Sequence, residues 1–153
     1  MKLTNRYLTF RITGLVATLY VAAAGSLFAQ LPTQASMVMA NDNRHPAGIL
    51  ANGVLNVRLF ARQGQWRPEE SDGPTLDVAA FGEESGSLVI PSPLLRAVEG
   101  TNIIVHVEND LAERLDIHGF VTRPAYNDAV FSIPAGEARE IRFSAGAPGT
   151  YHY

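Results

Sequence analysis

The stretch Asn102-Ile-Ile-Val-His-Val-Glu-Asn109 decides the fold class of this sequence. Four of its eight residues are β-branched, and the turn residues Glu99-Gly100 precede it. Because β-branched side chains fit a pleated, half-buried surface, we predict a β-strand over residues 102–109. A turn before such a run marks where the strand begins.

The same strand pattern recurs on both sides of this stretch. In residues 54–62, Leu55, Val57 and Leu59 alternate with other side chains, which is typical of a half-buried strand. Residues 63–74 are rich in turn formers and hold the single Trp, Trp66, so we predict a loop there. Further strands are predicted over residues 76–81, 87–90, 115–118, 138–144 and 150–153. Short strands separated by frequent turns predict an all-β fold, either a β-sandwich or a barrel.

The first 35 residues carry Lys2, Arg6 and Arg11 and no acid. An apolar run from Ile12 to Ala29 follows these cations, and small residues follow the run. This order is typical of a secretory signal. A single membrane anchor is the rival interpretation, but the core of the run, residues 15–29, is short for crossing a bilayer. We therefore predict a signal peptide over residues 1–35, export to the periplasm or extracellular space, and no membrane attachment after cleavage.

Composition excludes several classes of site and partner. A length of 153 residues allows one ordinary domain. The sequence has no Cys, which excludes a disulfide framework, a Cys nucleophile and a blue-copper site within this chain. The net charge is −3, and removal of residues 1–35 makes it more negative, because that segment carries three cations and no acid. The charge therefore does not favour a nucleic-acid partner.

The rest of the chain divides into two parts. Residues 36–53 are small and polar, and we predict an extended N-terminal arm. Residues 54–153 form the predicted all-β domain. Tyr153 falls inside the last predicted strand, with no turn or polar tail after it. We therefore expect an N-terminal fragment whose domain is truncated at its C-terminal end and prone to associate through its exposed sheet edge.

Several segments, in this order, resemble multicopper oxidases. Residues 90–96 are similar to a Gly-Pro segment of the family, with Ser92 where Gly is usual. The other matching segments are Gly100-Thr-Asn102 with Val107-Glu-Asn-Asp-Leu111, Leu115-Asp-Ile-His-Gly-Phe120, Ile133-Pro-Ala-Gly-Glu137 with the strand after it, and Ala147-Pro-Gly-Thr-Tyr-His-Tyr153. The order and spacing make the match specific over residues 53–153.

The resemblance implies an N-terminal plastocyanin-like (cupredoxin) domain, which is a Greek-key β-sandwich. In the family, such domains build an oxidoreductase that oxidises substrates at a blue-copper site and reduces dioxygen to water at a trinuclear copper cluster. The implied cofactor is copper, held with residues beyond Tyr153. The implied partners are downstream cupredoxin domains of the same protein or a homo-oligomer. The chain alone is not expected to be catalytically competent, and no catalytic residue is assigned.

His118 is the one residue to which the resemblance carries a copper-ligand role. It stands at the second His of the family's His-x-His-Gly pattern, because Gly119 follows it. The first position holds Asp116, and the family's second His-x-His would fall at positions 154–156. Residues two apart on a strand face the same side, so both rings of such a pair reach one metal. With Asp116 in the pair, a ligand role and a structural role for His118 are equally open.

The other three histidines are not assigned to copper, and two alternative functions stay open. For His152 a structural role is favoured, His106 is expected on the opposite strand face from its apolar neighbours, and His45 lies in the arm. Asp116 favours an alternative function, a metal-free cupredoxin-like structural or interaction domain. A third possibility, an adhesion module that resembles the family by chance, conflicts with the joint spacing of the segments.

Overall fold

A computed structural model describes residues 36–69, 72–84, 86–125 and 129–153. The predicted signal segment, residues 1–35, lies outside this part. The described residues form the strands β1 (Ser36–Met37), β2 (Met39–Ala40), β3 (Ile49–Ala51), β4 (Val54–Trp66), β5 (Leu76–Glu83), β6 (Leu88–Ile90), β7 (Asn102–Asn109), β8 (Leu115–Ile117), β9 (Phe131–Ile133) and β10 (Ala138–Ser144). Within these ranges there is no helix of the length and apolarity that a bilayer crossing needs.

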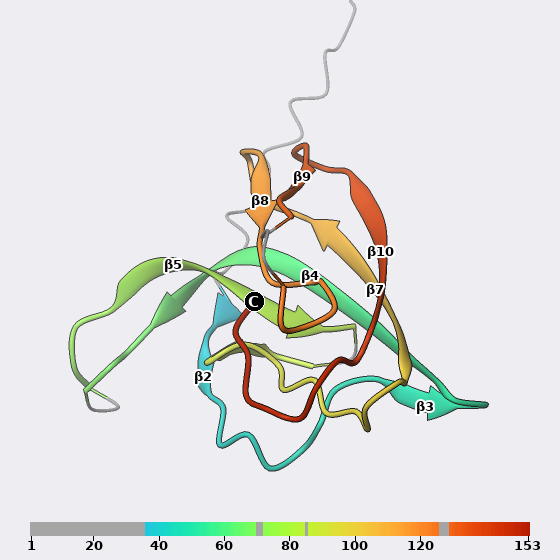
Figure 1. Ribbon diagram of the computed structural model, residues 1–153. Coiled ribbons are helices and arrows are strands. Elements are labelled where there is room, and N and C mark those ends of the chain that lie inside the picture. The colour runs from blue at the N-terminus through green and yellow to red at the C-terminus, as the bar shows by residue number, and fades with distance from the viewer. Residues whose placement is uncertain (1–35, 70–71, 85, 126–128) are drawn as a thin grey trace, which may run out of the picture. The chain divides into compact units, whose positions relative to one another are not determined.

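One mixed sheet dominates the molecule (Figure 1). Its strands follow the order β10-β7-β4-β5-β6-β2, and β1 and β3 also pair with β4. The pairs β4–β7, β1–β4 and β2–β6 are parallel, and the others are antiparallel. Because β7 lies between β4 and β10, neighbours in the sheet are not neighbours in sequence. Such crossovers are typical of Greek-key sandwiches.

The main core lies between this sheet and a separate two-stranded ribbon, β8–β9. The ribbon and the loop between its two strands contribute Ile117, Phe120 and Ile133, which are at most 4% exposed. They pack against the buried alternating side chains of β4, β7 and β10. A smaller apolar cluster of Val38, Ala80 and Leu88 lies apart from the main core. The fold is therefore the all-β sandwich that the sequence predicts.

Two strands begin and end where the sequence predicts, β7 over residues 102–109 and β10 over residues 138–144. The predicted loop over residues 63–74 is wrong at its start, because β4 continues to Trp66 and pairs with β5 along that length. The predicted strand over residues 150–153 is also wrong, since this segment hydrogen-bonds to no strand. Residues 36–53 include three short strands that pair with β4 or β6.

Candidate functional site

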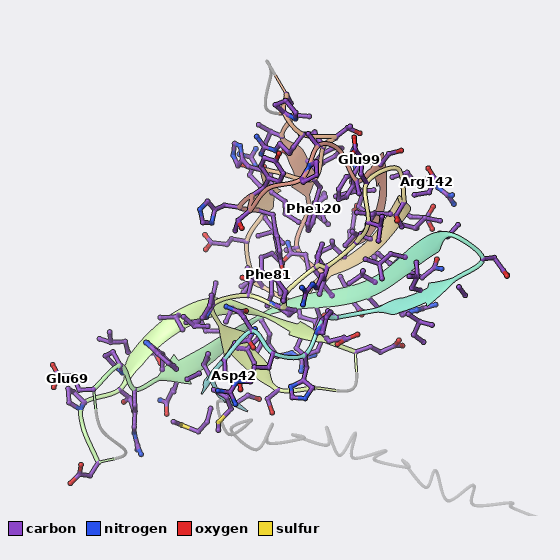
Figure 2. The ribbon with its side chains drawn as sticks, turned by 60° about the horizontal axis from the view of Figure 1, so that its bottom comes forward. Asp42, Glu69, Phe81, Glu99, Phe120 and Arg142 are labelled. Atoms are coloured by element: carbon purple, nitrogen blue, oxygen red, sulfur yellow. The ribbon has the colours of Figure 1, made fainter. Side chains whose placement is uncertain are left out.

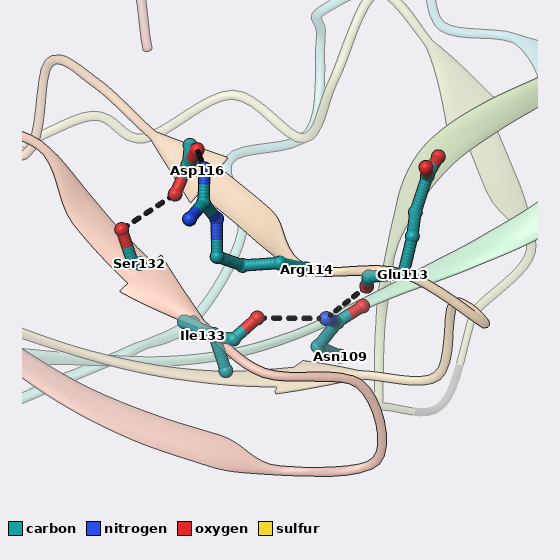
Figure 3. Close-up of polar contacts among 6 residues, drawn as sticks. All are labelled: Asn109, Glu113, Arg114, Asp116, Ser132 and Ile133. Atoms are coloured by element: carbon teal, nitrogen blue, oxygen red, sulfur yellow. Dashed lines mark hydrogen bonds and ion pairs between the residues drawn. The ribbon is translucent and has the colours of Figure 1, made fainter.

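The β8–β9 ribbon holds the segment that resembles the copper-binding pattern (Figure 3). Asp116 in β8 lies opposite Ser132 in β9. The Ser132 hydroxyl donates to Asp116 Oδ1, and an Arg114 guanidinium nitrogen donates to Asp116 Oδ2 at 2.7 Å. Both carboxylate oxygens therefore have partners within the ribbon. The Asp116 side chain acts as a polar link between the two strands.

The pKa of the Asp116 carboxyl is lowered by this arrangement. The main cause is the hydrogen bond from Ser132, and the hydrogen bond and positive charge of Arg114 act in the same direction. A smaller charge effect from His118 adds to the lowering. Asp116 is therefore ionised at neutral pH, and its charge is paired with that of Arg114.

His118 is exposed to solvent, directly after β8. His106 lies on β7 between Arg58 of β4 and Glu140 of β10, away from the β8–β9 ribbon. Its strand neighbours Val105 and Val107 are fully buried, so His106 occupies the opposite face, as predicted. His45 and His152 are exposed.

Gly119 brings two distant segments into backbone contact. A Cβ atom built on Gly119 would lie 2.3 Å from the carbonyl oxygen of His152 and 2.7 Å from Tyr153 Cα. No side chain fits at such distances, and Gly119 also has a φ of +85°, which glycine adopts readily. The glycine of the His-Gly pair is therefore required for the close approach of residues 118–119 to the segment ending at Tyr153.

Tyr153 holds that segment against the core. Its ring stacks on Phe120 with a centroid distance of 4.7 Å and lies 6.0 Å from the Phe81 ring. Figure 2 labels Phe120 and Phe81, the two aromatic partners of this residue. The Tyr153 hydroxyl donates to the carbonyl oxygen of Pro93. Burial raises the pKa of this hydroxyl above its usual value. Aromatic packing thus fixes the segment that the sequence interpretation assigned to a strand.

Asn109 is a site residue whose role sequence reasoning did not identify. Its side chain is fully buried. Its amide nitrogen donates to the carbonyl oxygens of Ile133 and Glu113 at 2.9 Å (Figure 3). Its amide oxygen accepts from the Leu111 N–H at 3.1 Å. These bonds tie the end of β7 to the loop before β8 and to the end of β9. The sequence does contain a pointer to this residue, because Asn109 belongs to a segment that carries the family resemblance.

An apolar groove of about 760 Å³ lies beside the same segment. It is lined by residues 94–99 and 143–153, with Ile103 and Phe120 also among the lining residues. The groove contains no residue that the sequence analysis assigns to copper. His118 is not among its lining residues.

The described residues do not fit a complete copper site. Among them, no three His, Asp or Glu side chains lie together in a way that could hold a metal ion. Asp116, the neighbour of His118 in the pattern, already has hydrogen-bond partners on both oxygens. Any copper site that includes His118 would therefore need ligands from outside the described part of the chain.

Comparisons with known proteins bear on the fold. No protein-family model matches the sequence, and no curated protein matches it significantly. The structure is similar to a multicopper oxidase from Campylobacter jejuni, described as a metallo-oxidase, with a TM-score of 0.51, 19% identity, and coverage of 74% of this chain and 24% of that chain. A laccase-like multicopper oxidase, CueO from Ochrobactrum sp., matches with a TM-score of 0.39, 21% identity, and coverage of 66% and 22%.

The chain spans about a quarter of the length of these two structures. At these identities the likeness concerns the fold. The match to the Campylobacter jejuni protein confirms the fold class that the ordered segments predict. The described chain has the cupredoxin-like β-sandwich fold of a multicopper oxidase domain.

Proposed function

We propose that this chain is the N-terminal plastocyanin-like domain of a multicopper oxidase-type oxidoreductase that is exported from the cytoplasm. The observation that carries the proposal is the contact of Gly119 with the backbone of His152 and Tyr153. In the family, histidines from the corresponding two segments reach one copper cluster. The same two segments lie together here, although more than thirty residues separate them in sequence.

Copper binding at an interface with downstream domains is part of this proposal. His118 would supply one imidazole ligand, and residues outside the described part of the chain would supply the others. Its exposed position directly after β8 and the contact of Gly119 with the His152–Tyr153 segment support this role. Copper would give the assembled protein its electron-transfer chemistry.

A second candidate function is a metal-free cupredoxin-like domain with a structural or interaction role in an exported protein. The Asp116 network favours this alternative. Ser132 and Arg114 occupy both oxygens of the residue that replaces a copper-binding histidine. In this alternative the ribbon is held together by a polar cross-strand pair and needs no metal.

Copper retention by the full exported protein, together with the downstream domains that would supply the other ligands, tests the proposal. The protein would be loaded with copper, desalted and analysed for bound metal, alongside His118→Ala. His45→Ala is the matched control, because His45 is also exposed but lies in the N-terminal arm. We expect the wild type and His45→Ala to retain copper and His118→Ala to lose it. A folded wild type that retains no copper would support the metal-free alternative.

Restoring the family's histidine pair gives a complementary test. Asp116→His restores an imidazole at the first position of the pair, two residues before His118, so that both positions of the pattern hold histidine. If the ribbon occupies a copper-ligand position, this variant retains copper more firmly than the wild type. Equal retention by Asp116→His and the wild type would argue that the ribbon does not face the metal.

A further inference from the structure

The strand β10 forms an outer edge of the main sheet. It pairs with β7 along its whole length, and no other strand of the described chain pairs with it. Such an edge presents backbone N–H and C=O groups that another chain can use. The side chains along this edge carry opposite charges at Glu140 and Arg142 (Figure 2 shows Arg142).

The hydrogen bonds at the end of β10 show which backbone groups face outward. Ala145 belongs to the set that points toward β7, because its N–H donates to Thr101 and its carbonyl accepts from Gly100. Ser144 points the other way, and its N–H donates to the Thr122 hydroxyl at 3.2 Å. Orientation alternates along a strand. The backbone groups of Ala138, Glu140 and Arg142 therefore also point away from β7.

We propose that β10 pairs with β10 of a second copy of this chain, antiparallel and about a twofold axis at Ile141. In this register Glu140 lies opposite Arg142 of the second copy, and Arg142 lies opposite Glu140. Both residues of each such pair direct their N–H and C=O groups across the interface, which is what a hydrogen-bonded antiparallel pair requires. The two sheets then continue into one.

The charge pattern selects this register over its neighbours. Shifting the axis by one residue to Glu140 places Glu140 opposite its own copy, and shifting it to Arg142 places the two Arg142 guanidinium groups opposite each other. If the twofold axis instead lies between two residues, each residue whose backbone groups point outward is paired with one whose groups point toward β7, and the hydrogen bonds between the copies are lost. A parallel arrangement in register again sets like charges side by side. Only the axis at Ile141 gives opposite charges at both positions.

Glu140 and Arg142 already form an ion pair within one chain, with a nitrogen-to-oxygen distance of 2.6 Å. Both side chains are at least 47% exposed, so this pair is available for a partner. In the twofold arrangement the pairs of two copies join into a group of four alternating charges. A single charged side chain on an edge strand normally discourages pairing with another strand. Here the negative and positive side chains of one copy lie opposite the positive and negative side chains of the second copy, which favours one antiparallel register.

Charge reversal at the edge tests the proposal. The full exported chain would be measured by sedimentation velocity over a range of protein concentrations. We expect the wild type to form dimers in a concentration-dependent way. Glu140→Arg and Arg142→Glu each place like charges opposite each other at both positions, so each should weaken dimerisation on the order of ten- to a hundredfold.

Two combinations should restore the dimer. The double variant Glu140→Arg/Arg142→Glu again pairs opposite charges, and so does an equal mixture of the two single variants. Glu108→Arg is the matched control, because Glu108 is exposed on β7, which is not an edge strand. It should dimerise like the wild type, and circular dichroism would confirm that every variant is folded.

Three results would overturn the proposal. The first is a wild type that stays monomeric at all concentrations. The second is a dimer that forms equally well in Glu140→Arg. The third is a pair of folded single variants that remain monomeric when mixed, because the register at Ile141 requires them to associate. The proposal does not depend on copper, so its failure would leave the proposed function intact.

Discussion

Replacement of Asn109 by Ala should strongly destabilise the domain. The Asn109 amide is fully buried and bonds to three segments: the loop before β8, the end of β9, and the turn that begins at Leu111. Alanine makes none of these bonds. Water cannot replace them readily, because the bonds to Ile133 and Leu111 are themselves buried.

The expected loss follows from the two buried partners. Leaving one buried polar group without a partner costs about 1–3 kcal/mol, so the Ile133 carbonyl and the Leu111 N–H together cost about 2–6 kcal/mol. Domains of this kind are stable by about 5–15 kcal/mol. The change therefore removes a large part of the free energy of unfolding. Asn109→Asp keeps the side-chain volume but loses the donor, and at neutral pH it should be at least as destabilising.

Urea unfolding followed by far-UV circular dichroism measures this effect. The midpoint should fall while the slope of free energy against urea stays unchanged, because the unfolded surface is the same. Asn56→Ala is the control, since Asn56 is exposed on β4, and it should change stability by less than about 0.5 kcal/mol. An Asn109→Ala variant as stable as this control would refute the reasoning.

Three further predictions concern the contacts around the ribbon and the segment that ends at Tyr153. Gly119→Ala should cost about 1–3 kcal/mol more than Gly53→Ala in urea unfolding, because both glycines have positive φ but only Gly119 lacks room for a Cβ. The lowered pKa of Asp116 predicts stability that is present above the usual pKa of about 3.9 and lost as the pH falls through the lowered value. Asp116→Asn should remove this component, so a stability difference from wild type that does not shrink in acid would contradict it. The raised pKa of Tyr153 predicts stability that is full below about pH 10 and declines as the pH rises from there. Tyr153→Phe should flatten this alkaline decline, and an unchanged decline in thermal melting would show that another group causes it.

The strands that the sequence predicts well are those whose side chains alternate without interruption. Residues 102–109 and 138–144 are examples, and their apolar positions are buried in the main core. The end of β4 escapes prediction because Gly64 and its glutamine neighbours interrupt the pattern. The glycine is needed there, since a Cβ would lie 2.7 Å from the side chains of Val38 and Leu88. Sequence reasoning cannot foresee a requirement that residues this distant impose.

In the candidate site too, some features are predicted from the sequence and others depend on residues that are distant in the sequence. The motif identifies His118. The hydrogen bond that Asp116 accepts comes from Ser132, which lies in a three-residue strand too short to be predicted from the sequence. The segment over residues 150–153 has the composition of a strand. Strand formation also needs a hydrogen-bonded neighbour, and here the segment is held through the Tyr153 ring instead.

The two separate apolar clusters give the protein an internal optical reporter. Trp66 is the only tryptophan, and it packs against the smaller cluster of Val38, Ala80 and Leu88. Its fluorescence therefore senses the region where β1 and β2 join the sheet, while circular dichroism averages over all strands. Comparing the two signals during unfolding would reveal whether the clusters melt together or one after the other, without adding any label.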